Sequence, residues 1–359
     1  MEARPGEAYR RILLDLLVPI GDTLFATPAV RALRRAQPAA HLTALVSGAN
    51  RAVLENDPDV DALLELGALR RGAFDLAVHF APYHDALDVA LGIPRSLRLP
   101  CPWLYWLLPH ANRRWRHLHA RDHYLEVLRP LGLHRPADRR LVLTVSDRQQ
   151  AFAGRFLRER GHQPGELLVG LHAGAAGFRG AKRWSADGFA YVARQLGHAR
   201  LVFFGGRADR ELARAVVEAG VPDGFIDTSG QVSLSQAIGI LSQLDLFVGN
   251  DSGPLHLAAA LGVPAVGVYG PTSVLTYHPI GPMVRAVYGS VPCPAQYGFI
   301  GNRPLWQRRA CRGECLDSLD PQQVADAAQE LLAERRCLPD RSEGSVPAGM
   351  RTESSPRSG

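Results

Sequence analysis

The sequence predicts an α/β protein built from two doubly wound, Rossmann-like domains. Short apolar runs of strand length alternate with helix-like stretches, an alternation typical of parallel sheets. The alternation occurs twice, on either side of the Gly- and Pro-containing stretch 160–165, which is the best linker candidate. A chain of 359 residues also exceeds one typical core and suits two domains. We therefore expect domains at residues 10–162 and 166–318.

Each expected element has a local signal. Strands are expected where short apolar runs lie between polar or turn residues: 12–18, 41–46, 74–80, 167–172, 200–204, 246–249 and 265–269. Helices are expected where start or stop residues bracket a longer stretch: 28–35, 122–131, 185–196, 209–219 and 233–243. Pro28 and Ser185 are start signals, and Gly132 and Gly220 are stop signals.

The two ends of the chain differ in character. Arg10 and Arg11 before an apolar run superficially resemble a signal peptide, but Asp15 interrupts that run and no small-residue cleavage site follows. We therefore interpret it as the first strand of a cytoplasmic protein. At the other end, an amphipathic pattern predicts a closing helix at residues 320–337. Residues 338–359, rich in Ser, Pro, Gly and charge, predict a disordered tail.

The composition excludes several protein classes. The apolar fraction of 46% is ordinary for a globular enzyme, and no apolar run is long enough to span a membrane. Five cysteines make a disulfide framework implausible in a cytosolic chain of this size. Cys293, Cys311 and Cys315 leave a zinc site open, although their spacing is not that of a standard zinc finger.

Positive charge is concentrated in one segment. Between Arg95 and His123 there are six arginines against one aspartate, a net charge of +5. Tryptophans, a tyrosine and leucines lie among these arginines, which suits an anionic membrane surface or an anionic lipid acceptor. Arg113, Arg114 and Arg116 are the candidate contacts. A solvated basic loop is the alternative, and no recognised motif supports nucleic-acid binding.

The most informative motif lies at residues 248–260. An apolar strand runs into Asp-Ser-Gly-Pro and then directly into a helix of small residues. Asp251 or Ser252 can cap this helix, and Gly253 lets the backbone approach a ligand closely. The free N–H groups of such a helix N-terminus suit a phosphate, and His256 lies near the same pocket. An ordinary capped helix between two buried strands is the alternative.

Two further blocks accompany this motif. Gly21 and Asp22 begin a Gly-Asp-x4-Thr-Pro block directly after the first apolar run, and residues 172–177 precede Lys182-Arg183-Trp184. In this order and at these separations, the three blocks resemble glycosyltransferase family 9, the ADP-heptose:lipopolysaccharide heptosyltransferases, over about residues 11–332. The resemblance implies a GT-B architecture, in which two Rossmann-like domains face each other across a cleft. It also implies that the C-terminal helix packs back across the first domain.

The resemblance assigns the chemistry to particular residues. It makes Asp22 the base for the acceptor hydroxyl, and we expect this carboxylate in a Gly-flanked loop facing the cleft; a helix cap is the alternative. It makes Lys182 the clamp on the departing diphosphate. The adjacent Arg183 could be mistaken for this clamp. The alternative interpretation of Lys182 is an ordinary surface charge before a helix. Ser185 stands where the family usually has a proline.

The remaining donor contacts are expected along the second sheet. Asp251, Ser252, Gly253 and His256 would hold phosphate and sugar, together with the small-residue loop that contains Gly174 and Gly177. The nucleoside would meet Asp209, in a Gly-Gly loop where the family often has glutamate, and Val232. The Asp-x-Asp patterns at residues 57–61 resemble a metal site of another glycosyltransferase fold. Their position predicts an exposed turn, so we expect no metal there.

These observations predict an inverting, metal-independent glycosyltransferase that needs no cofactor beyond its nucleotide-sugar substrate. The expected donor is ADP-heptose, although another nucleotide sugar stays open. The expected acceptor is an anionic, lipid-linked glycan of the lipopolysaccharide core, reached from the inner leaflet of the cytoplasmic membrane. Two alternatives remain: a nucleotide-sugar epimerase of similar fold, and a non-catalytic nucleotide-sugar-binding protein. An epimerase would leave the basic aromatic segment unexplained. A non-catalytic protein would leave the presence of Asp22, Lys182 and Asp251 together unexplained.

Overall fold

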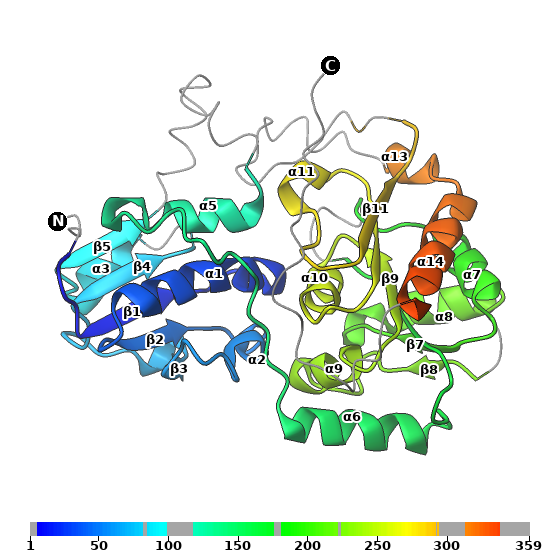
Figure 1. The fold of residues 1–359 in the computed structure, drawn as a ribbon, viewed down its shortest axis with the longest axis horizontal. Helices are drawn as coiled ribbons and strands as arrows, with labels where there is room; N and C mark the ends of the chain where they lie inside the picture. The colour runs from blue at the N-terminus through cyan, green and yellow to red at the C-terminus, as the bar shows by residue number, and fades with distance from the viewer. Residues whose placement is uncertain are drawn as a thin grey trace.

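The computed structural model describes residues 6–81, 85–98, 118–175, 181–221, 224–291, 293 and 313–337. Two fully parallel sheets lie beside each other, one in each half of the chain (Figure 1). The α/β prediction with two doubly wound units is confirmed. Several predicted positions lie outside the described residues: Arg113, Arg114, Arg116, Gly177, Cys311 and residues 338–359.

The first sheet has five strands in the order β3-β2-β1-β4-β5. Their bounds are β1 Arg11–Asp15, β2 His41–Leu45, β3 Ala62–Leu64, β4 Leu76–His79 and β5 Arg95–Arg98. The α-helices of this half are α1 Ile20–Ala36, α2 Arg51–Leu54, α3 Asp85–Leu91 and α5 Ala120–Glu126. The central strand β1 pairs with both β2 and β4, so its carboxyl end lies in the middle of the sheet edge.

The second sheet has six strands in the order β11-β10-β9-β6-β7-β8. Their bounds are β6 Leu168–His172, β7 Arg200–Phe203, β8 Ile226–Asp227, β9 Leu246–Asn250, β10 Ala265–Tyr269 and β11 Val284–Tyr288. Its helices are α7 Ala186–Gln195, α8 Arg210–Glu218, α9 Leu234–Leu241, α10 Gly253–Ala260, α11 Val274–Tyr277 and α13 Glu314–Asp317. β6, β9 and β10 are buried along their whole length, as expected for strands covered on both faces.

Helix α1 begins eight residues earlier than predicted, at Ile20. The prediction used Pro28 as a start signal, but Pro28 lies inside the helix. Proline has no N–H for the carbonyl four residues earlier. The Thr27 hydroxyl instead donates to that carbonyl, the oxygen of Leu24, over 2.8 Å. Asp22 is therefore in the first helical turn, and the expected Gly-flanked loop is wrong.

Two helices pack differently from expectation. Helix α6 (Asp147–Glu159) was not predicted, although Ser146 and Gln149 form a capping box at its start. It lies along α9 of the second half (Figure 1), although its residues fall within the first expected domain. Helix α14 (Pro321–Arg336) packs against α7 and strands β9 to β11. The expected packing of this closing helix across the first domain is therefore wrong.

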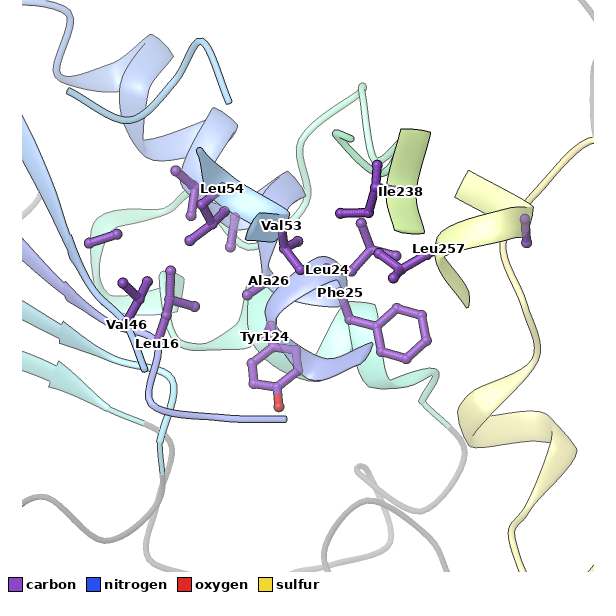
Figure 2. Packing of buried hydrophobic residues seen from close by; sticks show 14 of the residues in the cluster. Leu16, Leu24, Phe25, Ala26, Val46, Val53, Leu54, Tyr124, Ile238 and Leu257 are labelled. Atoms are coloured by element: carbon purple, nitrogen blue, oxygen red, sulfur yellow. The ribbon is translucent and has the colours of Figure 1, made fainter. Parts of the chain in front are cut away.

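One hydrophobic cluster continues from the first half into the second. Leu24 and Phe25 of α1 meet Ile238 of α9 and Leu257 of α10 (Figure 2). All four side chains are almost fully buried. Because α1 and α10 each begin at the carboxyl edge of their own sheet, this contact brings the two edges together. No helix in the described part of the chain is long and apolar enough to cross a membrane.

Candidate functional site

A charge cluster lies where β9 of the second sheet ends. Asp251 directly follows β9, and its Oδ2 is 2.7 Å from the Lys182 Nζ. Its Oδ1 is 3.2 Å from the His256 Nε2. Burial raises the pKa of Asp251, but Lys182 and His256 outweigh it and hold that pKa below its usual range. The structure thus brings together three residues predicted for the donor, around one ionised carboxylate.

Asn250, which the sequence analysis missed, joins the segments of this cluster. The Asn250 Nδ2 donates to the carbonyl of Ala173 over 2.7 Å. Its Oδ1 accepts from the backbone N–H of Trp184 over 3.1 Å. The side chain is fully buried, so it fixes the small-residue loop after β6 and the Lys182 segment against the end of β9. Its place at a strand end beside Asp251 is the sequence signal that could have identified it.

The expected side-chain cap at the start of α10, from Asp251 or Ser252, is wrong. Ser252 is the N-cap residue, but its hydroxyl donates to the carbonyl of Asn250 over 3.0 Å and caps no helix N–H. Pro254 has no N–H, and the N–H of Leu255 bonds to the carbonyl of Ser252 over 3.2 Å, so the N–H of Gly253 is the uncapped group of this turn. A Cβ on Gly253 would lie 3.1 Å from Ile20 of α1, so glycine here allows the two helices to approach closely.

The predicted nucleoside residues lie further along the same sheet edge. Asp209 accepts from the backbone N–H of Gly206 over 2.8 Å, and a Cβ on Gly174 would lie only 2.6 Å from its Oδ1. Gly174 and Asp209 are therefore neighbours. Val232 is half-buried and packs against the large core cluster. Ser229, which was not predicted, is fully buried, and its hydroxyl has no hydrogen-bond partner within the described residues.

Asp22 projects from the first turn of α1 toward this cluster. The Tyr124 hydroxyl donates to its Oδ1 over 3.0 Å. Burial raises the pKa of Asp22, while Tyr124, His256 and Lys182 oppose that rise. A Cβ on Gly21 would lie 3.2 Å from the His256 ring, so the start of α1 lies directly against α10. Tyr124 was missed because 102 residues separate it from Asp22 and no local pattern links them.

A chain of edge-on aromatic contacts crosses from one half to the other beside Asp22. The Phe25 ring lies between the rings of His119 and His256, with centroid distances of 5.0 and 4.8 Å. The His119 Nε2 donates to the carbonyl of His278, in the second half, over 2.8 Å. Burial lowers the pKa of His119 to about 4, so the ring is neutral near pH 7. These contacts hold the N-terminus of α1 against the donor cluster.

A second buried charge cluster, which the sequence analysis missed, lies at the carboxyl edge of the first sheet. The His79 Nδ1 is 2.9 Å from Asp15 Oδ2, and its Nε2 is 2.7 Å from Asp88 Oδ1. Arg98 at the end of β5 pairs with Asp88. Burial lowers the pKa of His79, but the two carboxylates raise it to about 9, so the ring is an imidazolium near pH 7.

Asp59 and Asp61 serve as partners of arginines in α1, whereas Asp57 is buried, so the expected exposed turn is wrong at that residue. Asp59 lies 3.5 Å from Arg31, and Asp61 pairs with Arg34. Asp57 accepts from the backbone N–H of Asp59 over 2.9 Å. Within the described ranges, no group of three or more His, Cys, Asp and Glu residues is arranged to hold a metal ion.

Comparison with known proteins identifies the family. The family model for glycosyltransferase family 9 (heptosyltransferase) matches residues 91–298, more than half of the chain. The chain belongs to glycosyltransferase family 9. Lipooligosaccharide heptosyltransferase 2 of Haemophilus influenzae is 24% identical over 286 residues, covering 71% of this chain and 81% of the relative. The enzyme of that name from Campylobacter jejuni is 29% identical over 176 residues, covering 47% of this chain and about half (52%) of the relative.

Solved structures of heptosyltransferases share the fold. The structure of E. coli ADP-heptose lps heptosyltransferase II superposes with a TM-score of 0.73 at 21% identity, covering 91% of this chain and 99% of that one. E. coli heptosyltransferase WaaC with ADP gives 0.61 at 19% identity, covering 89% and 99%. These likenesses confirm the GT-B architecture that the resemblance implied.

Proposed function

We propose that this family 9 protein is an inverting, metal-independent heptosyltransferase that moves heptose from ADP-heptose to an acceptor of the lipopolysaccharide core. One observation carries the proposal: Asp22, at the start of α1, faces the Lys182–Asp251–His256 cluster at the start of α10. The names of the relatives support the substrate class, and one solved relative is WaaC with ADP-2-deoxy-2-fluoro heptose. The family match favours transfer over the epimerase and non-catalytic alternatives.

The second domain would bind the donor. The Lys182 ammonium and the uncapped Gly253 N–H at the positive end of α10 together supply positive charge for a diphosphate. When the diphosphate binds, it takes Lys182 from Asp251, and Asp251 then accepts hydrogen bonds from sugar hydroxyls. Charge on the departing ADP is compensated by the protein's own groups, so the reaction needs no metal ion.

The first domain would supply the base. The acceptor hydroxyl loses its proton to Asp22 as its oxygen attacks the anomeric carbon. The bond from that carbon to the diphosphate oxygen breaks on the opposite face, so the configuration inverts and ADP leaves. A raised pKa strengthens a carboxylate as a base, and burial raises the pKa of Asp22.

The acceptor itself is proposed to be an anionic, lipid-linked glycan. The segment with Arg113, Arg114 and Arg116 lies outside the described residues, and its sequence supports contact with an anionic acceptor and the inner leaflet.

We also propose domain boundaries at residues 10–162 and 166–318. Helix α6 falls within the first of these ranges but packs against α9 of the second half.

The test combines ADP-heptose with lipopolysaccharide from cells that lack core heptose. We expect transfer that continues in EDTA and a product whose new linkage, assigned by NMR, has the inverted configuration. Asp22→Asn should slow turnover by roughly 10²-fold or more, with ADP affinity in calorimetry almost unchanged. Activity lost in EDTA and restored by magnesium contradicts the metal-independent mechanism. Isomerised donor without acceptor indicates the epimerase alternative.

A further inference from the structure

Tyr124 is a buried side chain whose hydroxyl donates a hydrogen bond to the Oδ1 of the proposed base, Asp22, over 3.0 Å. We infer that Tyr124 is a positioning residue for Asp22: it holds the Oδ1 atom and leaves Oδ2 to take the proton from the acceptor hydroxyl. This inference rests on the proposed function, because Tyr124 would act on the reaction only by orienting Asp22, the proposed base.

The Tyr124 hydroxyl is held rigidly in place. Tyr124 lies on α5, which packs along α1, and its ring is 3% exposed. The ring meets the Phe80 ring edge-on, with centroids 5.9 Å apart. Figure 2 shows the ring among the apolar side chains around α1, with the hydroxyl at the edge of this packing. A rigid ring fixes the donor position, so the carboxylate that accepts from it is fixed as well.

Asp22 is held from its backbone side too. The fully buried side chain of Asn50 donates to the carbonyls of Leu16 and Val18 over 2.6 and 3.0 Å. It also donates to the hydroxyl of Thr23 over 2.8 Å. These bonds fix the connection from β1 to α1, and hence the first turn that carries Asp22. With both partners fixed, the hydrogen bond restricts the carboxylate to one orientation.

Four groups set the protonation of Asp22 besides its burial. Tyr124 of α5, His256 of α10 and Lys182 each lower its pKa, whereas Asp251 raises it. The pKa of Tyr124 itself is raised well above its usual value by burial and by Asp22, so it remains a proton donor throughout the working pH range. Removing its hydroxyl removes a bond to the ionised carboxylate and shifts Asp22 toward its protonated form.

The first measurement needs no substrate. In protein with ¹³C-labelled aspartate carboxyls, the Asp22 resonance is assigned by its absence in Asp22→Asn and then titrated. In Tyr124→Phe, which keeps the buried ring, we expect the midpoint to rise by about one pH unit or more, the scale of one hydrogen bond to a charged group. Tyr9→Phe is the matched control, since Tyr9 is also buried but donates to Glu7. An unchanged midpoint in Tyr124→Phe overturns the inference.

The second measurement asks whether the contact acts through the base. The acid limb of kcat/KM should move to higher pH by the same amount in Tyr124→Phe, and ADP affinity should stay within about twofold. In the Asp22→Asn background, adding Tyr124→Phe should cause no further loss. An additional tenfold loss there shows that Tyr124 acts independently of Asp22 and overturns the inference. Near wild-type turnover in Asp22→Asn alone would instead show that Asp22 is not the base, which contradicts the proposed function. Failure of the inference about Tyr124 can therefore be distinguished from failure of the proposed function.

Discussion

The carboxyl edges of the two sheets each hold a buried charge cluster, yet the clusters differ in how completely their groups are paired. In the first-sheet cluster, both ring nitrogens of His79 meet carboxylates. In the second-sheet cluster, one carboxylate serves both Lys182 and His256 beside an uncapped helix N-terminus. The Nδ1 of His256 is buried and has no hydrogen-bond partner among the described residues.

This difference shows that buried charge alone does not mark a ligand site. A cluster whose hydrogen bonds are complete has little to gain from a ligand, whereas incomplete pairing beside a cleft leaves contacts for one to make. We therefore expect the His79 cluster to support stability and the Lys182 cluster to support donor binding.

The largest expected effect is on stability, at His79. His79→Gln removes the imidazolium between Asp15 and Asp88 and leaves two carboxylates close together in a buried site. Breaking such a buried charge network should lower the free energy of unfolding by about 3 kcal/mol or more. Urea unfolding measures this loss, and His41→Gln is the control because that side chain is 57% exposed. ADP affinity of the folded variant should stay unchanged; a large loss there would contradict the contrast.

The same histidine predicts a pH dependence. Its pKa is raised to about 9 in the folded protein, against about 6.5 when unfolded. A raised pKa means that the stabilisation is fully present below about pH 6.5 and is lost as pH rises through 9. Between pH 7 and pH 10, the wild type should lose roughly 2 kcal/mol more than His79→Gln. Parallel stability curves for the two proteins over this window would contradict the assignment.

The contrast also explains what sequence could and could not predict. The motifs at Asp22, Lys182 and Asp251 lie directly after strands or before helices, so alternating elements placed them at sheet edges. The His79 cluster and Tyr124 have no such signal, because their partners come from separate strands and helices. The start of α1 was misjudged because Thr27 compensates for the interior proline through a hydrogen bond that no propensity rule includes. Tertiary packing, likewise, decides where α6 and α14 lie.

The next prediction tests the donor cluster with Lys182→Ala. Losing one charge-assisted contact should weaken ADP binding by about ten- to hundredfold, measured by calorimetry. Arg183→Ala is the matched control, since Arg183 is exposed and should have much less effect. The reverse ranking would show that Arg183 is the clamp.

Lys182→Ala also leaves the Asp251 carboxylate with His256 as its remaining described partner, so some stability should be lost. Adding Asp251→Asn removes that uncompensated charge. The double variant Lys182→Ala/Asp251→Asn should therefore recover stability without recovering ADP affinity. Recovery of both would mean that the cluster serves stability alone, like the His79 cluster, and the contrast between the two edges would fail.

The smallest expected effect concerns His119, which joins the two halves of the chain. Its Nε2–H bond to the carbonyl of His278 is a neutral hydrogen bond, so His119→Ala should lower stability by roughly 1 kcal/mol at pH 7. His278→Ala is the control, because it keeps the accepting carbonyl. Burial lowers the pKa of His119 to about 4, below its unfolded value, so its stabilisation is present above about pH 6.5 and is lost as pH falls toward 4. The difference between wild type and His119→Ala should therefore shrink on acidification, opposite in direction to the alkaline loss at His79. A difference that grows in acid would mean that the His119 ring is held as a cation and that this contact is not the neutral bond seen here.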